Sequence, residues 1–196
     1  MNFVEFQYIG YQNQPIPANL HGKMGEEMRK RGESEMISAV PSNKRHFRKL
    51  MEFFHDILRI CRKAKANPVV YGSMAYFWHT LDTHAKINDV DLLVSEQAFP
   101  LIIEGLKKAK IQHRFYQKWR TIHVEKDGLK IELDSKEFWF HEKNEKCVRF
   151  NFGGLKIKSL NRNDLSRTYA TAIRKKKNKD YEKKYEKLTD LAAKQI

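Results

Sequence analysis

Two aspartates separated by a single residue lie in an otherwise apolar stretch, and this pattern constrains the fold more than any other feature of the sequence. In residues 87–94, Ile-Asn-Asp-Val-Asp-Leu-Leu-Val, Asp89 and Asp91 alternate with Val90 and Leu92. Because strand side chains alternate between faces, we expect a strand with both aspartates on one face and a core on the other. Two carboxylates about 4 Å apart repel by roughly 4 kcal/mol at an effective dielectric near 20. Such a pair needs solvent or a cation, and Mg²⁺ accepts one or two carboxylates together with triphosphate oxygens.

A glycine and a serine precede this strand in the sequence Val69-Val70-Tyr71-Gly72-Ser73, which predicts a short strand followed by a helix. Glycine at such a junction permits a positive φ and the close approach of a ligand to the backbone. Ser73 could cap the helix and donate its hydroxyl, and the first turn of a helix attracts phosphate. Gly72 and Ser73 are therefore candidate phosphate-binding residues.

A third carboxylate is expected from a later strand. The segment 130–135, Lys-Ile-Glu-Leu-Asp-Ser, places Glu132 and Asp134 two residues apart and thus on one face. Either could help to hold a metal or accept the proton of an attacking hydroxyl. The sequence leaves the choice between them open.

The rest of the chain predicts a mixed α+β domain. Apolar residues at spacings of three and four predict a helix over residues 44–66, with Ser42 or Asn43 as its cap. Hairpin turns are expected at Asp127-Gly128 and Gly153-Gly154. Strands are expected over residues 69–71, 87–94, 115–119, 121–125, 129–135, 148–152 and 155–158.

The organisation of the chain falls into three parts. Residues 1–43 are polar and proline-containing and predict a loosely structured N-terminal arm, residues 44–160 form the core, and residues 161–196 predict a C-terminal helical segment. Trp78 and Trp119 are expected in the core, not as platforms for stacked bases.

The composition bears on location and partners. The 196 residues carry a net charge of +14, which fits either a polyanionic partner, including nucleic acid, or simply a lysine-rich surface. We find no run of about 18 apolar residues and no secretory signal, so we expect no membrane interaction. Two widely separated cysteines argue against a disulfide scaffold, and a cytoplasmic location is the default expectation.

Over about residues 45–190, the combination of strand, Gly-Ser and Asp-x-Asp resembles the nucleotidyltransferase superfamily with the DNA polymerase β fold. The chain is most similar to the small bacterial branch with aminoglycoside, lincosamide and toxin–antitoxin nucleotidyltransferases. The resemblance implies a mixed sheet with helices on one side, followed by C-terminal helices. It places Asp89, Asp91 and a third acid, best matched by Glu132 with Asp134 as its rival, at the Mg²⁺ site.

The same resemblance assigns Gly72 and Ser73 to phosphate binding, with Lys179 of Lys179-Asp180-Tyr181 assisting at the nucleoside triphosphate. The implied reaction moves a nucleoside monophosphate from that triphosphate to an acceptor hydroxyl on a small molecule or RNA and releases pyrophosphate. The alternative is a catalytically degenerate fold that acts as a basic nucleic-acid- or protein-binding module, including within a toxin–antitoxin pair.

Overall fold

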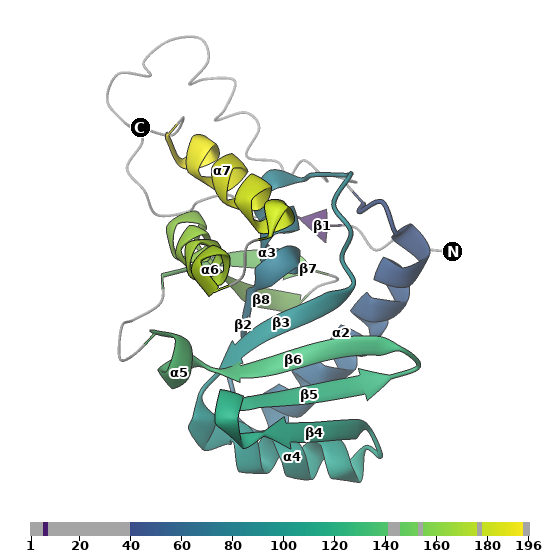
Figure 1. The fold of residues 1–196 in the computed structure, drawn as a ribbon. Helices are drawn as coiled ribbons and strands as arrows, with labels where there is room; N and C mark the ends of the chain where they lie inside the picture. Colours follow the sequence, from purple (N-terminus) through teal and green to yellow (C-terminus); the bar gives the residue numbers. More distant parts are fainter. Residues whose placement is uncertain (1–5, 8–39, 141–145, 153–154, 176–177, 194–196) are drawn as a thin grey trace, which may run out of the picture.

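The computed structural model describes residues 6–7, 40–140, 146–152, 155–175 and 178–193 (Figure 1). Most of the predicted arm and the Gly153-Gly154 turn lie outside the described residues. Phe6–Gln7 of the arm forms β1, which pairs with β7. The three-part division of the chain stays a prediction.

The described residues form an α+β fold. The helices are α2 (Lys44–Lys63), α3 (Gly72–Thr80), α4 (Phe99–Lys108), α5 (Lys136–Phe140), α6 (Arg162–Lys175) and α7 (Lys179–Ala193). The strands after β1 are β2 (Val69–Tyr71), β3 (Asp89–Val94), β4 (Gln112–Tyr116), β5 (Thr121–Lys126), β6 (Leu129–Ser135), β7 (Cys147–Phe152) and β8 (Leu155–Leu160). None of the described helices is long and apolar enough to span a membrane.

The strands make one mixed sheet in the order β1-β7-β8-β2-β3-β6-β5-β4. The pairs β2–β8 and β3–β6 are parallel, and the other neighbouring strands are antiparallel. Asp127 and Gly128 have φ values of 52° and 75°, which are the two positive values that a tight β5–β6 hairpin requires. The predicted turn at Asp127-Gly128 is confirmed.

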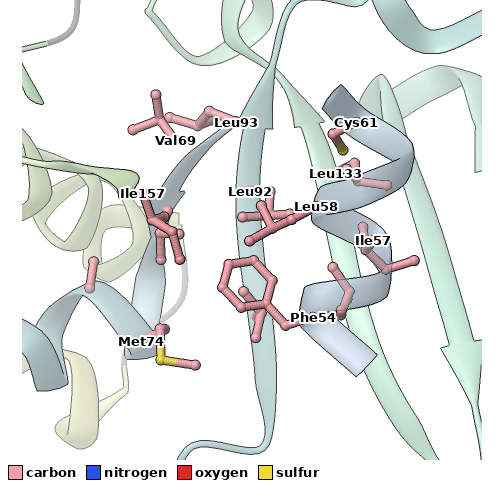
Figure 2. Close-up of a cluster of buried hydrophobic side chains, with 14 of the residues drawn as sticks. Phe54, Ile57, Leu58, Cys61, Val69, Met74, Leu92, Leu93, Leu133 and Ile157 are labelled. Atoms are coloured by element: carbon pink, nitrogen blue, oxygen red, sulfur yellow. The ribbon is translucent and has the colours of Figure 1, made fainter. Parts of the chain in front are cut away.

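One face of the sheet, which we call the helix face, is apolar. The register aligns Val70 with Leu92, Leu92 with Leu133 and Leu133 with Ile122, and each of these side chains is fully buried. Helices α2 and α4 lie behind this part of the sheet in Figure 1. Figure 2 shows Leu58 of α2 directed toward Leu92 of β3 within the buried cluster. The aligned registers explain how one continuous core forms beneath several strands.

The opposite face, which we call the open face, carries polar side chains at most of the alternating positions of β3, β5 and β6. Asp91 aligns with Tyr71 and Glu132, and Glu132 aligns with His123. In Figure 1 the front of β4, β5 and β6 carries no described helix. Helices α6 and α7 pack against each other and against α3, beside this face.

Several local expectations are corrected by the structure. Asn43 is the N-cap residue of α2, but its side chain makes no capping hydrogen bond. The side chains of Ser42 and Asn43 bind the loop before β3 instead, and Asn43 Nδ2 donates to the Ile87 carbonyl oxygen at 2.8 Å. The expected strand at 115–119 is displaced, since β4 ends at Tyr116 and Gln117–Trp119 forms a 3-10 turn.

The two tryptophans also differ from each other. Trp78 is buried on α3 as expected, and its ring lies 5.0 Å from that of Phe150. Trp119 is 53% exposed, so the expectation that it belongs to the core is wrong.

Candidate active site

Three predicted acids lie on adjacent strands of the open face. Asp89 and Asp91 project from β3, and Glu132 is the direct β6 neighbour of Asp91 in the parallel register. Asp89 and Asp91 are both half-buried, whereas Val90 between them is fully buried on the helix face. The alternation expected from the sequence is confirmed, and it brings two strands' acids together.

The electrostatics of this cluster oppose full ionisation. Burial, and then the negative charges of Asp89 and Glu132, raise the pKa of Asp91 well above its ordinary value, and the Lys184 ammonium opposes this shift. Burial also raises the pKa of Glu132, against the effect of His123. The negative charge of the three acids is therefore not fully compensated by nearby cationic side chains. A divalent cation bound there would compensate it.

The donor set fits Mg²⁺, which prefers oxygen ligands and keeps part of its coordination shell for substrate phosphates and water. Among the residues that the structure describes, no three acidic, histidine or cysteine side chains converge into a ready-made metal site. Phosphate oxygens and water would thus have to complete the shell that Asp89 and Asp91 begin.

Gly72 is required by the packing around Asp91. Its φ of +63° is in the left-handed region, as expected for the junction of β2 with α3. A Cβ atom there would lie 1.8 Å from Asp91 Oδ2 and 2.8 Å from its Cγ, so the Asp91 carboxylate would have to shift. The sequence predicted that a ligand would approach the backbone at Gly72. In the structure the Asp91 carboxylate makes this close approach, and the absence of a side chain at Gly72 leaves room for it at the start of α3.

Ser73 lies within hydrogen-bond distance of Lys184, a lysine that the sequence motifs did not predict. Lys184 Nζ lies 3.3 Å from Ser73 Oγ and 2.8 Å from Asp180 Oδ2, and only 12% of its side chain is exposed. The ammonium also lies over the rings of Tyr76 and Tyr169 at 5.7 and 6.0 Å from their centroids. The spacing of four between Asp180 and Lys184 on one helix was an available signal for this pair.

Lys179, the lysine chosen from the sequence, is the first residue of α7 and is exposed. It lies on the same helix as Lys184 but more than one turn earlier. Its role at the triphosphate stays a prediction.

Asp134 differs from Glu132 in what surrounds its carboxylate. The Tyr71 hydroxyl donates to Asp134 Oδ2 and the Thr121 hydroxyl to Oδ1, both at 2.5 Å, and only 4% of the residue is exposed. The Glu132 side chain is 36% exposed, with His123 Nε2 3.5 Å from its Oε1. Asp134 thus ties β2 and β5 to β6, and Glu132 keeps a surface open to a ligand.

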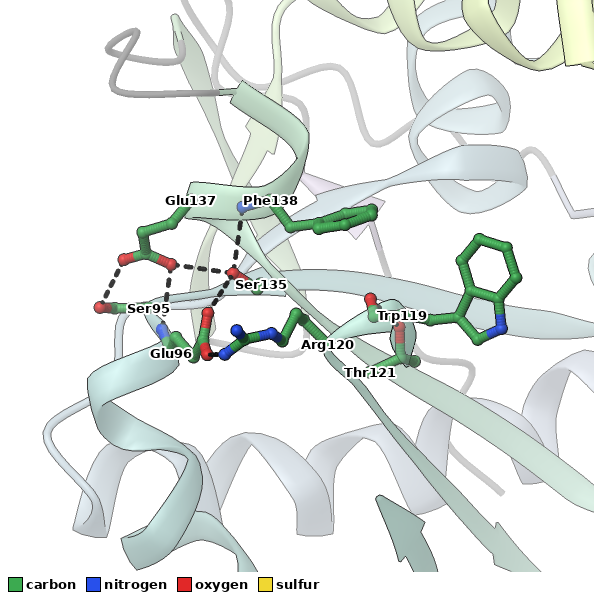
Figure 3. Close-up of polar contacts among 8 residues, drawn as sticks. All are labelled: Ser95, Glu96, Trp119, Arg120, Thr121, Ser135, Glu137 and Phe138. Atoms are coloured by element: carbon green, nitrogen blue, oxygen red, sulfur yellow. Dashed lines mark hydrogen bonds and ion pairs between the residues drawn. The ribbon is translucent and has the colours of Figure 1, made fainter. Parts of the chain in front are cut away.

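A second polar network fixes the ends of β3 and β6 (Figure 3). Ser135 Oγ donates to Glu96 and Glu137, each at 3.1 Å, and Glu96 also pairs with Arg120. Ser95 Oγ donates to Glu137 at 2.8 Å. This network holds the α5 turn and the β4–β5 turn beside the acid cluster.

The sequence matches no protein-family model and no curated protein. Solved structures do resemble the fold. ANT(2″)-Ia in complex with adenylyl-2″-tobramycin has a TM-score of 0.56 and 12% identity, over 75% of this chain and 96% of that chain. The lincosamide antibiotic adenylyltransferase LnuA, lincomycin-bound, has a TM-score of 0.54 and 11% identity, over 72% and 96%.

A third similar structure is an antigenic nucleotidyltransferase-like protein from Paracoccidioides brasiliensis, with a TM-score of 0.54 and 12% identity over 73% of this chain and 77% of that chain. At such identities the likeness concerns the fold, and the reaction has to be argued from the site. The mixed sheet, its helix layer and these three likenesses agree with the resemblance found in the sequence. The protein has the fold of the nucleotidyltransferase superfamily, shared with aminoglycoside and lincosamide nucleotidyltransferases.

Proposed function

We propose that the protein is a Mg²⁺-dependent nucleotidyltransferase that moves a nucleoside monophosphate from a nucleoside triphosphate to an acceptor hydroxyl and releases pyrophosphate. The observation that carries the proposal is that the acids of β3 and β6 lie beside the junction of β2 with α3, where Gly72 and Ser73 are placed. Asp91 contacts the Gly72 position directly and aligns with Glu132, while Ser73, the next residue, meets Lys184.

Asp89 and Asp91 are the residues that would hold the cation against the donor. Mg²⁺ bound there would neutralise phosphate charge and fix the triphosphate for in-line displacement. The raised pKa of Asp91 supports this assignment, since burial beside two other carboxylates is costly unless a cation compensates.

The start of α3 would bind the phosphates. Backbone N–H groups of the first helical turn are unsatisfied within the helix and favour anions, and the Ser73 hydroxyl adds a donor. Lys184 supplies the positive charge at this corner, 3.3 Å from Ser73. Lys179, exposed on the same helix, stays a candidate for the distal phosphates.

Glu132 would orient the acceptor hydroxyl and accept its proton. A carboxylate whose pKa is raised by burial is a better base near neutral pH than an ordinary glutamate. Asp134, with both oxygens engaged by Tyr71 and Thr121, would act as a positioning residue. Catalysis would then come mainly from positioning and charge neutralisation, as in other phosphoryl transfers.

Isothermal titration of each nucleoside triphosphate, with and without Mg²⁺, tests the proposal. We expect Mg²⁺-dependent binding of at least one triphosphate to the parent protein and its loss in Asp89→Asn and Asp91→Asn, which keep side-chain size and remove charge. The control is Asp56→Asn, since Asp56 on α2 is half-buried, with 43% of its side chain exposed, and makes only weak surface ion pairs.

The degenerate-fold alternative makes the opposite prediction. It requires that no triphosphate binds to the parent, and that nucleic acid binds without Mg²⁺ and with strong salt dependence. Unchanged triphosphate binding in both Asp89→Asn and Asp91→Asn would contradict the assignment of these residues, because the donor site would then lie elsewhere.

A further inference from the structure

A continuous row of side chains leads from the candidate third acid to the edge of the sheet. Glu132 Oε1 lies 3.5 Å from His123 Nε2, and the His123 and Tyr116 rings lie 4.5 Å apart at their centroids. The Arg114 guanidinium then lies 4.9 Å from the centre of the Tyr116 ring. The row therefore crosses β6, β5 and β4 without a break.

The row lies on the open face. His123 aligns with Glu132 across β5–β6, and Arg114 aligns with His123 across β4–β5, so all three share that face. The His123 side chain is 46% exposed and Arg114 is exposed. Figure 1 shows no described helix in front of these strands, while α2 and α4 occupy the other side.

The turn at the end of β4 adds an exposed aromatic ring. Trp119 is 53% exposed, and the Lys118 ammonium lies 5.0 Å from its ring centre. The next residue, Arg120, has a φ of 50°, a costly conformation for a residue with a side chain. The network of Figure 3 holds this turn in place through the contacts of Arg120 with Glu96. The exposed ring is thus presented by a fixed turn.

We propose that this surface, defined by Arg114, Tyr116, Lys118, Trp119 and His123, binds the single-stranded end of a nucleic acid as the acceptor. The inference rests on the proposed function and names its acceptor class. Aromatic rings stack on bases of any sequence, and cationic side chains beside them bind the phosphates. The overall charge of +14 favours a polyanionic acceptor and opposes a polycationic one such as an aminoglycoside.

The dimensions suit this placement. Neighbouring strands lie about 4.8 Å apart, so the row from β6 to β4 spans roughly 10 Å. An end whose last hydroxyl lies at Glu132 would place the preceding base over His123 and Tyr116, with a backbone phosphate near Arg114. Trp119 follows Tyr116 by three residues, and its exposed ring would extend the stacking surface beyond the end of β4.

The chemistry at Glu132 then balances. The terminal ribose hydroxyl oxygen forms a bond to the α-phosphorus of the triphosphate, and the bond from that phosphorus to the pyrophosphate oxygen breaks. The hydroxyl proton goes to the Glu132 carboxylate and then to solvent. The products are an oligonucleotide longer by one nucleotide and pyrophosphate.

The test measures binding of a fluorescent single-stranded RNA oligonucleotide by anisotropy, and transfer of a radiolabelled nucleotide to the same RNA. We expect Tyr116→Ala and Trp119→Ala each to weaken RNA binding about 5- to 150-fold, the range for loss of one stacked base. Tyr116→Phe and Trp119→Phe should restore binding. Arg114→Ala should reduce the slope of log affinity against log salt by about 1.

The matched control is Arg59→Ala, an arginine whose side chain is 65% exposed on α2, behind the sheet. Its effect on RNA binding should be small, and all variants should unfold at the temperature of the parent. Equal RNA affinity in Tyr116→Ala, Trp119→Ala and the parent overturns the inference, as does transfer to an aminoglycoside or lincosamide with none to RNA.

Failure of the proposed function gives a different result. Mg²⁺-dependent triphosphate binding would then be absent, whereas RNA binding would still fall in the Tyr116 and Trp119 variants. That outcome would support RNA binding at this surface and contradict the proposed transferase activity. Transfer to RNA that is lost in Asp91→Asn, with RNA binding intact, supports both proposals.

Discussion

The two faces of the sheet are built from the same strands and differ in almost every property. Leu92, Leu133 and Ile122 on the helix face are fully buried, while their sequence neighbours Asp91, Glu132 and His123 point to the open face. Stability and chemistry are thus assigned to alternate residues of one strand. Substitutions at neighbouring residues of one strand should therefore affect either stability or triphosphate binding, but not both.

Leu92→Ala should have the largest effect on stability. The side chain is fully buried between α2 and the sheet, and its truncation leaves a cavity that costs about 3–5 kcal/mol of the free energy of unfolding. Urea unfolding measures the loss, and triphosphate binding per folded molecule should stay near the parent value. Leu101→Ala, at a position that is 52% exposed, should stay within about 0.5 kcal/mol, and an equal loss there would contradict the contrast.

Gly72→Ala should affect both properties, because it lies where the faces meet. A left-handed backbone costs roughly 1–2 kcal/mol for a residue with a Cβ, and the Asp91 carboxylate would also be displaced. Gly128→Ala is the matched control, with a φ of +75° and no atom within 4 Å of the added carbon. Both should lose stability in urea, but only Gly72→Ala should lose triphosphate binding. Equal loss of triphosphate binding in both variants would show that the contact between Gly72 and Asp91 is not what matters for binding.

Glu132→Gln and Asp134→Asn should separate a reacting acid from a positioning acid. Glu132→Gln should lower transfer by about 10²–10⁴-fold with little loss of stability, since it removes a general base. Asp134→Asn should cost about 1–3 kcal/mol of unfolding free energy, because one buried hydroxyl loses its acceptor. Single-turnover assays and urea unfolding measure the two effects, and a reversed pattern would exchange the roles.

Lys184→Met and Lys179→Met should rank the two lysines of α7. Loss of the Lys184 ammonium removes a charge-assisted hydrogen bond next to Ser73, and we expect roughly tenfold weaker triphosphate binding. Lys179 is exposed, so its replacement should have a smaller effect in the same titration. A larger effect at Lys179 would favour the lysine chosen from the sequence.

Part of the pH dependence of stability should arise from Asp91 on the open face. The pKa of Asp91 is raised in the folded state, so its contribution to stability is present below the ordinary value of 3.8 and is lost as pH rises through the folded value. In the presence of a chelator, the unfolding free energy of the parent should fall over that range. Asp91→Asn should show a shallower fall, and an identical fall would show that Asp91 does not titrate as described.

Local chemistry made several elements predictable. The spacing of apolar residues located α2, the alternation located β3, and Asp127-Gly128 located a hairpin, because each depends on neighbours in sequence. One failure had a non-local cause. Asn43 stands at the N-cap position of α2, but its side chain bonds to the backbone of Ile87, 44 residues away in sequence, instead of to the helix.

The sequence by itself determined which residue types would form the site: an Asp-x-Asp strand, a Gly-Ser junction and a later pair of acids. Tertiary structure decided which of them meet. Glu132 and Asp134 are equivalent by alternation, and their tertiary contacts distinguish them: Asp134 accepts from the hydroxyls of Tyr71 and Thr121, whereas Glu132 lies beside His123. Lys184 reaches Ser73 across 111 residues of sequence. Contacts of this kind depend on strand register and helix packing, which no local pattern encodes.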